Sequence, residues 1–123
     1  MVFIEKQNML VLIVEENKNP VLKRIPNRLY TLREIIQNEF IEVVNYKDVL
    51  LVYDQEAFKK LLPVNRKVDK YNIRGTFIIT GNDERYKDFK DLTPEQIEKY
   101  TKEFEIEQEK NIENEQGEEL EDE

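Results

Sequence analysis

The stretch PVNRKVDKYNIRG, residues 63–75, combines side chains that are suited to holding an anion. Arg66 carries a planar guanidinium with five N–H donors, which matches carboxylates and phosphates. Lys67 and Arg74 lie close to it in the sequence and add positive charge. Asn65 can hydrogen-bond the backbone of its own turn and tolerates the left-handed conformation. Together these residues predict a ligand site for an anionic group.

Two interpretations of the Asn65–Arg66 pair stay open. In the first, Arg66 binds an anionic ligand, and tyrosines stack against that ligand. In the second, Asn65 forms the turn and Arg66 forms an ion pair with an acid of the fold such as Asp54 or Asp69. Aromatic residues on strands more often pack on a sheet than form ligand platforms. The candidate stacking residues are Tyr46, Tyr53 and Tyr71.

The sequence lacks the usual catalytic residues. It has no cysteine and no histidine, and it also has no serine. Nucleophilic mechanisms that pair Ser or Cys with His are therefore excluded, as are the common zinc sites. Asp48 and Asp54 lie six residues apart on one predicted strand, and the pair Asp83–Glu84 is a weak candidate for magnesium. We expect no enzymatic activity, no metal and no cofactor.

Charge is concentrated at the C-terminal end. Residues 105–123 contain ten acids and one base, whereas residues 1–104 contain eighteen bases and seventeen acids. Such an acidic segment, poor in bulky apolar residues, cannot offset its ordering entropy by burial. We therefore expect one folded domain over residues 1–106 and a disordered acidic tail over residues 107–123. Because the domain is nearly neutral, direct nucleic-acid binding is not favoured.

Periodicity predicts an α+β domain with a mainly antiparallel sheet and helices packed on it. Short β-branched or apolar runs predict strands, and three- to four-residue apolar spacing predicts helices, with Gln37 as a solvent-facing polar residue. The element order is ββαββ(α)βα. The predicted strands cover residues 9–16, 21–26, 41–46, 48–54 and 74–81, and the predicted helices cover 29–40, 56–62 and 94–104.

The last helix has the clearest start signal. Thr93 can cap the helix while Gln96 reaches back to its amide, and Pro94 occupies the first helical position. No apolar run approaches the length of a membrane span, and the N-terminus has no basic region of the kind that signal peptides carry. We therefore expect a cytoplasmic protein without a membrane partner. Whether residues 1–5 pair with the sheet or with another chain is left open, as is a homo-oligomer.

Four blocks of sequence, in order, resemble a family of small phage and mobile-element bacterial proteins, the domain of unknown function DUF3846. The resemblance covers about residues 9–104. Ahead of the Ile-Glu strand, this chain has Glu39 and Phe40 where a glycine is typical of the family. The blocks are YTLREIIQNEFIEVV, LLVYDQEAFKKLLPVNRKV, IRGTFIITGND and LTPEQIEKYTKEF.

The resemblance implies a phage or mobile-element setting inside a bacterial host cell. It does not indicate any particular activity. Two functions then compete. In the first, the protein binds and sequesters an anionic small molecule, such as a nucleotide-derived host defence signal, through Arg66 and its neighbours. In the second, it is an interaction module that inhibits or recruits a bacterial host protein through a sheet edge or its acidic tail.

Overall fold

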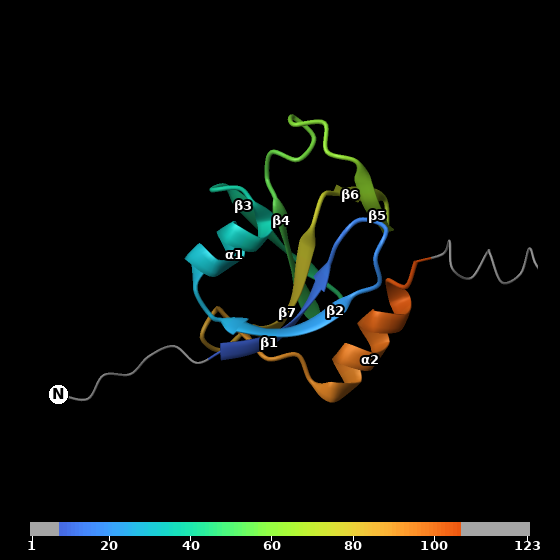
Figure 1. The fold of residues 1–123 in the computed structure, drawn as a ribbon. Coiled ribbons are helices and arrows are strands. Elements are labelled where there is room, and N and C mark those ends of the chain that lie inside the picture. The colour runs from blue at the N-terminus through green and yellow to red at the C-terminus, as the bar shows by residue number, and fades with distance from the viewer. Residues whose placement is uncertain (1–7, 107–123) are drawn as a thin grey trace, which may run out of the picture.

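The computed structural model describes residues 8–106, and the predicted α+β class with a mainly antiparallel sheet is confirmed (Figure 1). Residues 1–7 and the predicted disordered tail, residues 107–123, lie outside the described residues. The elements are β1 (Asn8–Val14), β2 (Val21–Pro26), α1 (Leu29–Ile36), β3 (Ile41–Tyr46), β4 (Val49–Asp54), β5 (Val64–Val68), β6 (Tyr71–Arg74), β7 (Phe77–Asp83), β8 (Asp88–Lys90) and α2 (Pro94–Glu103).

The main sheet has the strand order β2-β1-β7-β4-β3, and all neighbours in it are antiparallel. The short strand β8 pairs with the last residues of β7. β7 lies in the middle because its residues are apolar on both faces: Phe77, Ile78 and Ile79 are all fully buried. β2 and β3 are the two edge strands. β5 and β6 form a separate two-stranded hairpin.

Two hydrophobic clusters cover opposite faces of the sheet, because successive side chains of a strand point to opposite sides. On one face, Leu32 and Ile36 of α1 pack with Val11, Val52 and Ile78. On the other face, α2 and the β5–β6 hairpin both contribute residues to the second cluster. Figure 1 shows α1 and α2 on opposite sides of the strands. The second cluster joins Leu12, Val14, Leu51, Phe77, Ile79, Val68, Ile73, Tyr100 and Phe104.

The start of α2 and the end of α1 follow local capping rules. Thr93 Oγ1 accepts a hydrogen bond from Gln96 N at 3.1 Å, and Gln96 Oε1 accepts one from Thr93 N at 2.9 Å, so the predicted capping box is present. α1 is shorter than predicted. It ends at the exposed Gln37, which adopts a left-handed conformation (φ 63°) and donates its N–H to Arg33 O.

The predicted helix over residues 56–62 is wrong: this segment is a series of turns. Only one helical turn forms, with Lys60 N bonded to Glu56 O, before the chain reverses at Leu61. There Leu62 N bonds to Ala57 O and Leu61 N bonds to Phe58 O, the pattern of a helix C-terminal cap with Leu61 left-handed at φ 58°. A helix of one turn is not stable by itself, and the following proline prevents its extension.

The strands β5, β6 and β8 were not predicted, because they are short and their residues are mostly polar. The predicted strand over residues 74–81 begins only at Phe77 and continues to Asp83. Gly75 lies before it with φ 74°, a conformation that favours glycine. Gly81 lies within it. A Cβ atom at Gly81 would approach Asp91 O to 2.4 Å, so the close backbone contact there requires glycine.

Candidate functional site

Arg66 uses its guanidinium inside the fold. Its Nε and Nη2 donate to the carbonyl oxygen of Phe104 at 3.0 and 2.9 Å, and Nη2 also donates to Lys18 O at 2.6 Å. Its Nη1 donates to Asn65 O at 3.1 Å and to Asn65 Oδ1 at 2.6 Å. These bonds occupy all five N–H groups of the side chain. Burial lowers the pKa of Arg66 from its ordinary value.

Asn65 completes this connection. Its Nδ2 donates to Val14 O and to Gly75 O, both at 2.8 Å. The pair therefore ties the β5–β6 hairpin to the end of β1 and, through Phe104, to the end of α2. The partners of Arg66 are thus carbonyl and amide oxygens rather than either of the acids that the sequence suggested, Asp54 and Asp69.

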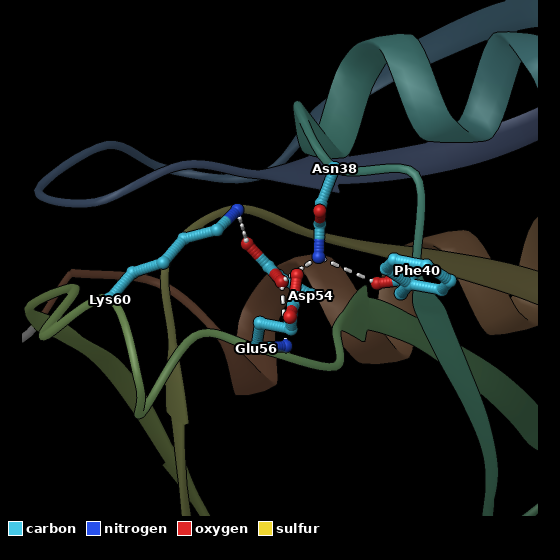
Figure 2. Close-up of polar contacts among 5 residues, drawn as sticks. All are labelled: Asn38, Phe40, Asp54, Glu56 and Lys60. Atoms are coloured by element: carbon cyan, nitrogen blue, oxygen red, sulfur yellow. Dashed lines mark hydrogen bonds and ion pairs between the residues drawn. The ribbon is translucent and has the colours of Figure 1, made fainter.

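Asp54 is itself buried. Figure 2 shows that both of its carboxylate oxygens take part in polar contacts. One carboxylate oxygen accepts hydrogen bonds from Asn38 Nδ2 and from Glu56 N, the latter at 2.8 Å. The other oxygen pairs with Lys60 Nζ at 2.8 Å. Asn38 also donates to Phe40 O. This network fixes the turns after β4 against the loop between α1 and β3, and it positions the wall of the groove described next.

A groove of about 520 Å³ lies where the main sheet meets the β5–β6 hairpin. β3 and β4 form one wall, and the hairpin and the turns after β4 form the other. Its apolar lining includes Val44, Leu51, Ala57, Val68 and Ile73, and its polar or aromatic lining comprises Glu42, Asn45, Tyr46, Tyr53, Asp54, Gln55, Phe58, Asp69, Tyr71, Asn72 and Arg74.

The three predicted tyrosines all line this groove. Tyr53 on β4 lies near Glu42 on β3 and Tyr71 on β6; burial, and then the charge of Glu42, raise the pKa of Tyr53. Tyr71 is 74% exposed, so its ring is free to contact a ligand. Tyr46 is buried at the other end, where its hydroxyl donates to Glu103 of α2. Of the three tyrosines in the groove, Tyr71 is therefore exposed, and Tyr53 and Tyr46 are more deeply placed.

Arg74 supplies positive charge to the groove. Its Nη1 donates to Leu62 O at 2.9 Å, and its guanidinium lies 5.3 Å from the ring centroid of Phe58. The other N–H groups of the guanidinium have no acceptor among residues 8–106. Glu42 and Asp69 contribute negative charge to the same groove and form no ion pair with another residue of the described part. The groove thus offers donors at Arg74 and acceptors at the two carboxylates.

The structure brings together four of the six residues that the sequence proposed: Tyr46, Tyr53, Tyr71 and Arg74. Asn65 and Arg66 are not among the residues that line the groove. Sequence reasoning missed Phe58, Glu42 and Asp69, because it placed Phe58 on a helix and had no means of pairing two separate acids. Local sequence carries no signal for contacts between β3 and a hairpin some twenty residues later.

The acids that the sequence raised for catalysis or metal binding do not converge in the described part. Asp48 accepts hydrogen bonds from Gln96 Nε2 at 2.9 Å and from the Tyr100 hydroxyl. Asp83 Oδ1 accepts one from Tyr86 N at 3.4 Å in the β7–β8 turn. Over residues 8–106, no group of three or more acids could hold a metal ion. No helix in that range is long and apolar enough to span a bilayer.

Comparison with known proteins identifies a family. The model of a family described as a domain of unknown function, DUF3846, matches residues 9–105, which is more than half of the chain. Neither the curated proteins nor the solved structures contain a match.

Proposed function

This chain belongs to the DUF3846 family, and we propose that it is a non-catalytic binding protein for an aromatic small molecule that carries an acidic group. The observation that carries the proposal is the groove beside the β5–β6 hairpin, where three tyrosines and Arg74 surround an apolar floor. Its volume of about 520 Å³ falls within the range of small-molecule sites.

The side chains of the groove define the ligand's chemistry. A flat ring system packs on Tyr53 and Tyr71, since aromatic rings favour offset stacking. One acidic group lies at Arg74, whose unused N–H donors suit a carboxylate or a phosphate. Glu42 and Asp69 accept hydrogen bonds from N–H or O–H groups and disfavour a ligand of high negative charge. A nucleotide-derived molecule with one phosphate has all three features.

The biological role follows from binding without reaction. In the phage or mobile-element setting that the family resemblance implies, such a protein sequesters a nucleotide-derived defence signal of its bacterial host. Sequestration requires a stoichiometric amount of protein and no catalytic residue, in keeping with a sequence without serine, cysteine or histidine.

The first experiment is native mass spectrometry of the protein purified from a bacterial host, followed by calorimetric titration with nucleoside monophosphates. We expect Arg74→Met to weaken binding by at least about tenfold, since a hydrogen bond to a charged group contributes about 1.5–3 kcal/mol. We expect Tyr71→Ala to weaken it as well. The matched control is Lys67→Met, which removes an exposed charge from β5 outside the groove.

A second candidate function has its own support. Three successive residues of the edge strand β3, Val44 to Tyr46, line the groove, so the groove reaches the open edge of the sheet. Phe58 and Leu61 beside it are 74% and 80% exposed. An extended segment of a host protein that pairs with β3 fits this arrangement. If binding of the host-protein segment is lost in Val43→Pro and intact in Arg74→Met, this function is favoured over the first.

A further inference from the structure

The second edge of the sheet, β2, carries an exposed basic strip. β2 pairs only with β1, so its outer edge is open in the described part of the chain. Val21 and Leu22 are 50% and 48% exposed, and Lys23 and Arg24 are exposed beside them. Arg28, the residue before α1, lies two residues after the end of the strand. We call Val21–Arg24 together with Arg28 the β2 strip.

The charge of the β2 strip is uncompensated among residues 8–106. None of its three bases takes part in an ion pair there. Of the two acids that precede the turn into β2, Glu15 pairs with Lys18 at 3.6 Å, and Glu16 is half-buried. An open edge strand is also a site where other chains pair, and proteins commonly protect such an edge. Both features point to an acidic, extended occupant.

The described chain ends next to this strip. Ile106 N donates to Asn19 Oδ1 at 2.9 Å, in the turn that leads into β2. Arg66 binds the carbonyl oxygens of Phe104 and Lys18 and so holds the end of α2 against the same turn. Figure 1 shows the end of α2 beside the loop between β1 and β2. The segment after Ile106 therefore starts at the entrance of β2.

Residues 107–123 have the charge and the length to occupy this edge. They contain nine acids and one base, and Ile112 and Leu120 are their bulky apolar residues. An extended chain advances about 3.3 Å per residue, so seventeen residues reach far beyond the roughly 20 Å of a six-residue strand. We propose that residues 107–123 bind the β2 strip of the same chain. The acidic tail then covers an open edge, and any acidic partner of β2 must displace it.

The absence of cysteine allows a direct test. Because the sequence has no other cysteine, a spin label attached to the variant Glu115→Cys is the only label on the full chain. We expect it to broaden the amide signals of residues 21–25 in about 20 mM salt, and we expect the signals to recover in about 500 mM salt, because screening weakens exposed charge pairs. The double variant Lys23→Glu with Arg24→Glu is expected to abolish the broadening.

The matched control is Lys59→Glu with Lys70→Glu, which reverses two exposed charges on turns next to the groove. This variant is expected to leave the broadening of β2 unchanged. The proposal is overturned by absent broadening in low salt, by broadening that survives reversal of Lys23 and Arg24, or by equal broadening in the control. A mixture of spin-labelled chains with isotope-enriched chains that carry no spin label is a further control. Broadening in this mixture would likewise overturn the proposal, since the contact would then lie between molecules.

Discussion

At the scale of single residues, Arg66 shows how a side chain suited to binding an anion serves as an internal connector. Its five N–H groups all bond to oxygen atoms of the fold, three of which belong to the main chain. A guanidinium satisfies several carbonyl groups at once, because its donors point in fixed directions within one plane. Arg74, eight residues later, retains free donors in the groove.

This difference predicts opposite effects of two matched substitutions. We expect Arg66→Met to lower the free energy of unfolding by about 2–4 kcal/mol, because it leaves partly buried carbonyl groups without donors. Arg74→Met is expected to change stability much less and to weaken ligand binding instead. Urea unfolding followed by circular dichroism measures the first effect. If Arg66→Met keeps full stability and loses ligand binding, the ligand site lies at Arg66 after all.

At the scale of elements, α2 is attached to the β3–β4 turn by polar contacts as well as by its apolar face. Asp48 in that turn accepts hydrogen bonds from Tyr100 and Gln96, and Lys47 Nζ lies 2.9 Å from Glu103 Oε1. Tyr100 is fully buried, and burial, followed by the hydrogen bond to Asp48, raises its pKa. α2 therefore needs an acceptor at the position of Asp48.

The attachment of α2 depends on pH in a defined direction. Hydrogen bonds from Tyr100 and then Gln96 lower the pKa of Asp48 below its ordinary value. A carboxyl group with a lowered pKa stabilises the fold above its unfolded pKa, about 3.9, and this stabilisation is lost as pH falls through the folded value. We expect the stability difference between the wild type and Asp48→Asn to be constant near pH 7 and to shrink below about pH 4. A difference that does not change down to pH 2 would contradict this.

At the scale of the whole molecule, one sheet joins two hydrophobic clusters into one unit. Both clusters include residues of β1, β4 and β7. If either α1 or α2 detaches, the same strands are therefore exposed. We therefore expect unfolding in a single cooperative transition. Urea curves from circular dichroism and from tyrosine fluorescence should coincide. Separate midpoints would show that the hairpin, the turns after β4 and α2 unfold before the sheet.

Local sequence determined most of the strands and both helices. The β-branched runs of β1, β3, β4 and β7 and the capping box at Thr93 act through neighbouring residues, and their physical causes are visible in short windows. The segment after β4 was misjudged, because apolar spacing at Phe58, Leu61 and Leu62 fits a helix. Tertiary bonds from Asp54 to Asn38 and Lys60 hold that segment as turns instead.

The candidate site was predicted in part, and the reason is physical. Residue type alone identified the tyrosines and the arginines as potential binding groups, since stacking and guanidinium chemistry belong to the side chain. Which arginine retains free donors depends on where Phe104 and Lys18 lie relative to β5, and these residues are far away in the sequence. The sequence by itself therefore determined the strands, the caps and the available chemistry. Only the tertiary structure decided that Arg66 holds the fold together while Arg74 faces the groove.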